Sequence, residues 1–174
     1  MLASCFIKLA LEHDYLGQRT ADIRATLHSD PDLRQFPDSA YAITEHPDRI
    51  FRFPNWTTLN VTAKREDLHL EFNFLRDTCF GLLLVDTTSN FAQIRELVSL
   101  VTSSFGPHSS YRHIDTTGSS IDDSDEYYWN TANNRVLLSR SRLDVTQSIH
   151  MFFLLIEDTT KANPISRALG FPSK

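Results

Sequence analysis

LHLEFNF, at residues 68–74, is the stretch that decides the fold class of this chain. Apolar and polar residues alternate along it without interruption, which is the pattern of a half-buried antiparallel strand. Residues 76–78, RDT, follow and have the length of a hairpin turn, and residues 79–85, CFGLLLV, are almost wholly apolar. Such a run is typical of a central strand that is covered on both faces. The sequence therefore predicts an antiparallel hairpin within the sheet.

Further stretches with strand-like patterns lie on both sides of this hairpin. They cover residues 41–45, 50–53, 59–63, 126–131, 136–139 and 149–156. Several of the connections between them have hairpin length, which favours antiparallel pairing. We therefore expect a mainly antiparallel sheet of about six to eight strands.

Two stretches have the period of an amphipathic helix. The first, residues 20–27, places Ile23 and Leu27 on one face. The second, Phe91–Phe105, carries a continuous apolar stripe and is followed by GP at residues 106–107. This pair ends a helix, because glycine takes the left-handed cap conformation and proline cannot continue the hydrogen bonding. We expect both helices to pack on one face of the sheet, which makes the fold class α+β.

Length and composition predict a single domain over residues 1–174. Within it we expect an N-terminal segment at 1–15, a long polar loop at 108–125 and a C-terminal tail at 161–174. No internal repeat is evident. The net charge of -5 disfavours nucleic-acid binding, which needs a basic surface. No apolar run reaches the roughly 18 residues of a transmembrane segment, so we expect none.

Acidic and aromatic residues gather at the end of the predicted loop. The candidate partner-binding residues are Asp122, Asp123, Asp125, Glu126 and Tyr128. Their spacing does not match a calcium-binding loop of the EF-hand type. Like charges in this arrangement are typical of a solvated loop, and the alternative is a patch that attracts a basic protein partner.

The reactive residue types are present but scattered. His108 and His113 share the predicted loop with the acidic residues, although no two histidines have the spacing of a metal motif. Cys79 opens an apolar strand, a setting that raises the pKa of a thiol and makes it a poor nucleophile. We therefore assign no catalytic residue, no metal ligand and no cofactor. A small hydrolase or metal-dependent enzyme built from His108, His113 and the aspartates is kept as an alternative.

Two short stretches at the N-terminus bear on location. Residues 2–5, LASC, resemble the lipobox that precedes an acylated cysteine, which makes Cys5 a candidate lipidation site. The basic and apolar segments of a signal peptide do not precede it in this sequence. The alternatives for Cys5 are an ordinary buried thiol and a bridge to Cys79. Residues 16–27, LGQRTADIRATL, resemble the opening of small bacterial envelope lipoproteins that assist outer-membrane assembly, which implies an envelope location.

Three functions compete on this evidence. The first is a non-catalytic binding domain of bacterial origin, anchored as an envelope lipoprotein if translation starts upstream. The second is a cytoplasmic immunity or antitoxin-like protein that uses the acidic loop against a basic partner. The third is the small enzyme described above. The sequence as written indicates a cytoplasmic location.

Overall fold

The computed structural model of the chain describes residues 2–47, 56–65, 67–88, 91–115, 123–144 and 149–160, together with Ile165. Within these residues the helices are α1 (Leu2–Glu12), α2 (Thr20–Ser29), a short 3-10 turn (Leu33–Gln35) and α3 (Phe91–Phe105). The strands are β1 (Tyr41–Pro47), β2 (Trp56–Ala63), β3 (Leu68–Leu75), β4 (Thr78–Thr88), β5 (Ser110–Asp115), β6 (Asp123–Asn130), β7 (Asn134–Asp144) and β8 (Ile149–Asp158).

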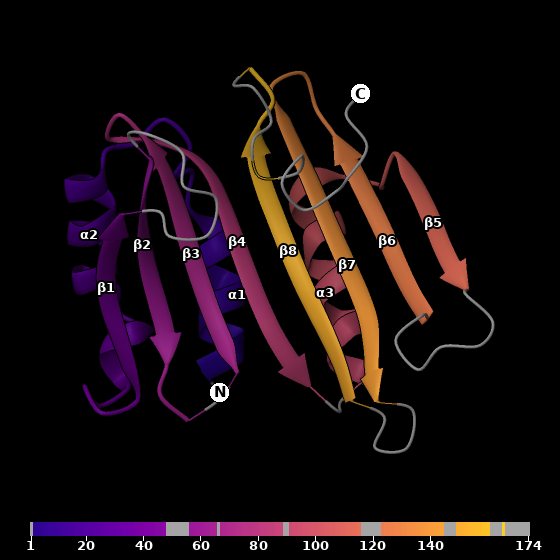
Figure 1. Cartoon of the computed structure of the whole chain (residues 1–174), viewed down its shortest axis with the longest axis horizontal. Coiled ribbons are helices and arrows are strands. Elements are labelled where there is room, and N and C mark those ends of the chain that lie inside the picture. Colours follow the sequence, from indigo (N-terminus) through magenta and orange to yellow (C-terminus); the bar gives the residue numbers. More distant parts are fainter. Residues whose placement is uncertain are drawn as a thin grey trace.

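The strands form one antiparallel sheet in the order β1-β2-β3-β4-β8-β7-β6-β5. The helices lie behind this sheet in the view of Figure 1, and their apolar side chains share one core with the strands. The predicted α+β class, with an antiparallel sheet and helices on one face, is confirmed. None of the helices in the described part of the chain is long and apolar enough to cross a bilayer.

The sheet consists of two halves with the same topology. In each half a helical segment precedes four consecutive strands that pair in sequence order, β1 to β4 in the first and β5 to β8 in the second. The last strands of the two halves, β4 and β8, pair with each other from Gly81 opposite Glu157 to Thr88 opposite His150. The fold therefore repeats a topology that the amino-acid pattern does not reveal.

Helix α1 covers the centre of the sheet. Its buried residues lie on most of its circumference, and they are Leu2, Ala3, Cys5, Phe6, Ile7, Leu9 and Ala10. Because so much of this short segment is apolar, its sequence has no narrow stripe by which a helix would be recognised. Helix α3 ends where residues 106–107 predict: Gly106 has a φ of 81° and its amide donates to the Thr102 carbonyl at 2.8 Å.

The face of β3 that points away from the helices is less exposed than its alternating sequence predicts. Glu71 and Asn73 are buried there, at 7% and 1% exposure. Trp56 Nε1 donates to Asn73 Oδ1 at 2.9 Å, and Asn73 Nδ2 donates to Glu71 Oε1 at 3.0 Å. These hydrogen bonds allow polar side chains to be buried on this face, since a buried polar group needs a partner.

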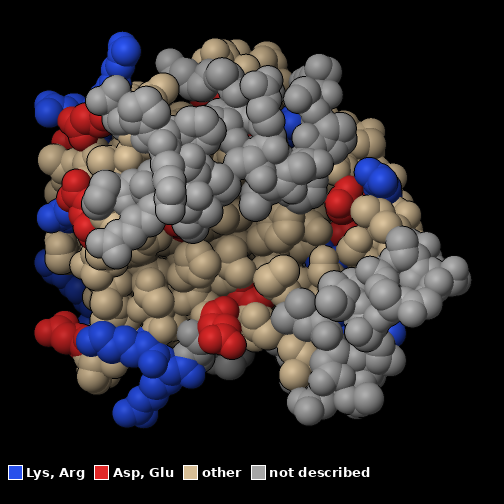
Figure 2. Space-filling view, viewed as in Figure 1, with Lys and Arg blue, Asp and Glu red and all other residues tan. Residues whose placement is uncertain are grey.

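A second apolar cluster explains this burial. It consists of Trp56, Phe80, Tyr128, Leu137, Leu155 and Ile165. Ile165 belongs to the predicted C-terminal tail and is 1% exposed. It lies directly over Gly81, where an added methyl group would come within 2.5 Å of Ile165 Cδ1. In Figure 2, which shows this face, the described charged groups lie mainly toward the margins, with mostly uncharged residues between them.

One predicted segment, the loop at 108–125, differs from the structure. The predicted loop at 108–125 contains β5 and the start of β6, so most of its described part is extended. Strand β5 is held by pairing with β6 and by the Tyr111 ring, whose centroid lies 5.0 Å from that of Tyr127. Its sequence is polar because an edge strand is more exposed than a central one. The strand predicted at 50–53 lies outside the described residues, as does the tail apart from Ile165.

Substitution of Gly81 tests the packing of Ile165. We expect Gly81→Ala to lower the free energy of unfolding by about 1–2 kcal/mol, because the new methyl group overpacks against Ile165. In an Ile165→Ala background the same substitution should cost much less, since the clashing atom is gone. Urea unfolding of the two single variants and the double variant measures this coupling. Additive effects would contradict the contact.

Candidate functional site

The structure separates the acidic residues that the sequence places in one patch. Asp122 lies outside the described residues, and Asp123 opens β6, where its side chain is not described. Asp125, Glu126 and Tyr128 also belong to β6. Because consecutive residues of a strand face opposite sides, Asp125 points to the helix side of the sheet while Glu126 and Tyr128 point to the other.

Glu126 and Tyr128 contact each other in the interior. The Tyr128 hydroxyl donates to Glu126 Oε2 at 2.7 Å, and both side chains are buried. Burial, together with this hydrogen bond to a carboxylate, raises the pKa of Tyr128. These two residues support the second apolar cluster and present little surface to a partner.

Asp125 is the centre of a different group, which we call the Asp125 cluster: Tyr111, His113, Asp125, Arg140 and His150. The Tyr111 hydroxyl donates to Asp125 Oδ1 at 2.7 Å, and His113 Nδ1 lies 2.8 Å from the same oxygen. Arg140 Nε donates to Asp125 Oδ2 at 2.8 Å, and a second guanidinium nitrogen contacts the same oxygen. One carboxylate thus holds three side chains from two neighbouring strands.

The pairing register of the strands places this cluster. His113 lies opposite Asp125, and Asp125 lies opposite Arg140, so the three follow one another across β5, β6 and β7. On the next strand toward the centre of the sheet, β8, the Nδ1 atom of His150 lies 3.2 Å from Arg140 Nη1. Arg140 is 4% exposed. A buried guanidinium is therefore fixed between a carboxylate and an imidazole.

The cluster also shifts pKa values. Burial acts to raise the pKa of Asp125, but the hydrogen bonds from Tyr111, His113 and Arg140 outweigh it and leave the pKa below its ordinary value. The hydrogen bond to Asp125 raises the pKa of Tyr111 to about 12. Asp125 is accordingly a carboxylate at neutral pH, and the Tyr111 hydroxyl keeps its proton.

Two strands of the first half, β2 and β3, differ from this in the same layer. On the inner strands β2 and β3, the residues facing the helices are apolar at their central positions: Leu59, Val61, Leu70 and Phe72. In the second half, Asp125 and Arg140 interrupt the corresponding layer formed by Tyr127, Trp129, Val136 and Leu138. A buried ion pair is seldom more stable than apolar packing of similar volume. Packing alone therefore does not account for this pair.

The contacts of His113 and His108 indicate what chemistry the Asp125 cluster could support. The His113–Asp125 contact is the geometry that orients an imidazole as a general base. His108, which the sequence groups with His113, packs instead against Tyr127 and Trp129, with ring centroids 5.6 and 6.0 Å away. Among the described residues no group of three or more His, Cys, Asp or Glu side chains is placed to hold a metal ion.

The two cysteines are both buried and not bonded to each other. Cys5 lies within α1, and burial raises the pKa of its thiol to about 11. Burial raises the pKa of Cys79 to about 12. Neither thiol has the lowered pKa of a nucleophilic cysteine. Acylation of Cys5 would require this turn of α1 to leave the core.

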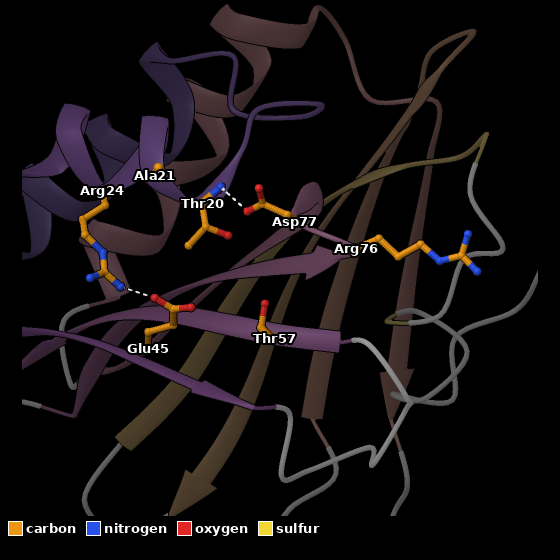
Figure 3. A pocket seen from close by; sticks show the side chains of 7 residues that line it. All are labelled: Thr20, Ala21, Arg24, Glu45, Thr57, Arg76 and Asp77. Atoms are coloured by element: carbon orange, nitrogen blue, oxygen red, sulfur yellow. Dashed lines mark hydrogen bonds and ion pairs between the residues drawn. The ribbon is translucent and has the colours of Figure 1, made fainter.

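A second candidate site lies between α2 and the β3–β4 hairpin (Figure 3). Its cavity of about 640 Å³ is lined by Thr20, Ala21, Arg24, Glu45, Thr57, Arg76 and Asp77. Arg24 forms an ion pair with Glu45, and Arg19 Nε lies 2.9 Å from Asp77 Oδ2. Three of the four charged residues that line the cavity are thus in ion pairs, while the Arg76 side chain extends away from the other labelled residues.

The hairpin turn at this cavity has a structural role. Asp77 Oδ1 accepts the amide proton of Thr20 at 3.1 Å, so the turn caps α2, whose own N-cap residue, Arg19, makes no side-chain capping bond. The hydrogen bonds to Arg19 and Thr20 lower the pKa of Asp77. Arg76 and Asp77 have φ values of 52° and 62°, a conformation that two-residue hairpin turns usually assign to asparagine and glycine. We interpret this cavity as part of the contact by which α2 packs against the sheet.

No protein-family model, curated protein or solved structure matches this chain. The functional interpretation therefore depends on the geometry of the chain itself, in which the Asp125 cluster departs from simple packing, as does the buried Arg135–Glu157 pair on the other face of the sheet. Sequence reasoning identified Asp125 and His113 but missed Tyr111, Arg140 and His150. The available signal was Arg140, a charged residue that follows Val136 and Leu138 at two-residue intervals and therefore lies on the same face of the strand.

Substitution of the ion pair tests its cost. We expect Asp125→Leu or Arg140→Met alone to lower the free energy of unfolding by about 2–4 kcal/mol, because each leaves a charge without its main partner. The double variant should be more stable than either single variant, since both charges are gone. Urea unfolding at neutral pH measures the three effects. A double variant that loses the sum of the two single effects would contradict the interpretation.

Substitution of Arg76 tests the strain in the hairpin. We expect Arg76→Gly to raise the free energy of unfolding by about 0.5–1 kcal/mol, because glycine takes a positive φ without steric cost. Arg76→Ala removes the same side chain but keeps a β-carbon, so it is the matched control and should give no gain. Thermal and urea unfolding compare the two variants. Equal gains would show that the side chain, and not the backbone conformation, is responsible.

Proposed function

We propose that this chain is a non-catalytic protein-binding domain whose binding surface is the edge strand β5. One observation carries the proposal: the buried Arg140–Asp125 pair holds Tyr111 and His113 in place on that edge. Tyr111 is 49% exposed, and the side chain of His113 is 47% exposed. The cluster thus fixes two side chains that remain within reach of a partner.

Fixed side chains favour binding because less conformational entropy is lost when the complex forms. Tyrosine is also among the residues that contribute most at protein interfaces, since its ring gives contact area and its hydroxyl a hydrogen bond. Here Asp125 already restrains the Tyr111 hydroxyl and the His113 ring. This arrangement supports a preorganised contact surface and accounts for a costly ion pair beneath it.

The position of β5 favours an extended partner segment. It is the last strand in the sheet order and pairs with β6 on one side only among the described strands. An edge strand offers backbone hydrogen-bonding groups to an additional strand. The sequence on either side of the β5–β6 connection is acidic, with Asp115, Asp122 and Asp123, which favours a partner segment that carries Lys or Arg.

The chemical preference of the edge can be tested with random peptides displayed on phage. We expect selection on the wild-type chain to enrich peptides that contain basic and β-branched residues. Their affinity for a Tyr111→Ala/His113→Ala variant, measured by fluorescence anisotropy, should fall at least about tenfold, the effect of losing a strong interface contact. The matched control is His28→Ala/Leu100→Ala, which removes an exposed histidine and an exposed apolar residue from the helices and should leave the affinity unchanged.

The Asp122→Asn/Asp123→Asn variant distinguishes long-range electrostatic attraction from the direct contacts of Tyr111 and His113 in the same assay. We expect slower association at low ionic strength with little change in dissociation, because long-range attraction between charges acts mainly on the encounter of the two partners. Selected peptides that bind the Tyr111/His113 variant as tightly as the wild type would overturn the proposal. Selection of acidic peptides would overturn the basic-partner assignment.

A further inference from the structure

A separate cavity lies on the helix side of the sheet, between the C-terminal ends of α1 and α3. Its volume is about 280 Å³. Leu82 of β4 and Ile156 of β8, which are direct partners in the sheet, belong to its lining. Leu11, Leu16 and Phe105 contribute further apolar surface. None of these residues belongs to the β5 edge, so the cavity is independent of the proposed protein-binding surface.

The apolar lining suits a small hydrophobic group. Leu82 and Ile156 are buried, while Leu11, Leu16 and Phe105 are partly buried and pack against the main core. Ligand pockets in proteins usually have volumes of about 300 Å³ or more and combine apolar walls with a few polar groups. This cavity is at the small end of that range, which limits the occupant to a short aliphatic chain or a single ring.

Two of the polar residues at this cavity are acidic, and the others are His13, Tyr15 and Asn134. Glu12 and Asp14 line it and are exposed. His13 is the one basic type among the lining residues described, and its Nε2 lies 3.9 Å from the Asp30 carboxylate. A protonated His13 therefore has an acidic neighbour of its own. The charge that faces an incoming ligand is negative.

The two helices reinforce this charge. Both α1 and α3 end at the cavity, and neither has a basic residue in its last turn. Helix C-termini carry a partial negative charge from their last carbonyl groups and attract cations. Glu12 adds a carboxylate to the last turn of α1, where a cation would be more favourable. Two helix ends and two carboxylates thus lie at one cavity whose walls are partly apolar.

We propose that this cavity binds a small organic cation with an apolar body, of the alkylammonium class. The apolar part lies against Leu82 and Ile156, and the ammonium group lies at the mouth beside Glu12 and Asp14. The carboxylates and the helix carbonyl groups accept its N–H hydrogen bonds. The same charges disfavour a carboxylate ligand of equal length.

Titration with hexylammonium and hexanoate tests this proposal, because the two probes share an aliphatic chain and differ in the sign of the charge. In amide-resolved NMR spectra we expect hexylammonium to shift the signals of Leu11, Leu16, Leu82 and Ile156 with saturation in the millimolar range. Hexanoate should bind at least about tenfold more weakly. Equal affinities, or hexylammonium shifts that do not include these residues, would overturn the proposal.

Two sets of variants locate the charge and the apolar contact. Glu12→Gln/Asp14→Asn should weaken hexylammonium binding several-fold and reduce the preference over hexanoate. The matched control, Asp67→Asn/Glu96→Gln, removes two exposed carboxylates elsewhere and should leave both unchanged. Leu16→Trp fills the cavity and should abolish binding, provided that its spectrum shows a folded chain. If the Glu12/Asp14 variant binds hexylammonium as tightly as the wild type does, the proposal is overturned, whatever the result for Leu16→Trp.

Discussion

The pairing of β4 with β8 is the interaction on which the rest of the structure depends. It joins two four-stranded halves that would otherwise each present an additional open edge. Both strands are apolar on both faces: Leu84 and Leu154 contribute to the main core under the helices, and Leu155 to the second cluster, against which Leu83 packs. The same pairing therefore requires cover on each side, from the helices on one and from Ile165 on the other.

The pairing of β4 with β8 also determines where the two candidate sites lie. Strand β5 becomes an edge, and the neighbouring strands β6 and β7 carry Asp125 and Arg140 on the helix-facing side, where the central positions of β2 and β3 have apolar side chains. The small cavity lies at the seam itself, over Leu82 and Ile156, where the ends of α1 and α3 leave space between them. The β5 edge carries the polar side chains of the proposed binding surface, and the cavity combines apolar residues with the carboxylates of Glu12 and Asp14.

Local patterns predicted much of the fold because burial acts on short stretches. The alternation at residues 68–74 and the apolar run at 79–85 correspond to β3 and β4, and α3 has the predicted bounds. Helix α1 was not recognised because it is buried on most of its surface. The loop predicted at 108–125 was wrong over β5, since an edge strand is stabilised by its neighbour and needs few apolar residues of its own.

The sequence by itself determined the α+β class, the antiparallel sheet and the residue types near the candidate site. Only the tertiary structure decided which residues meet. The pleat of β6 sends Asp125 and Glu126 to opposite faces, so the acidic group divides, while the register across β5, β6 and β7 brings His113, Asp125 and Arg140 into one row. Strand register joins residues far apart in the chain, and no local pattern of apolar and polar residues specifies it. The hairpin of β3 and β4, which the stretch LHLEFNF predicts, thus lies in the interior of a sheet whose far edge, β5, carries the candidate binding surface.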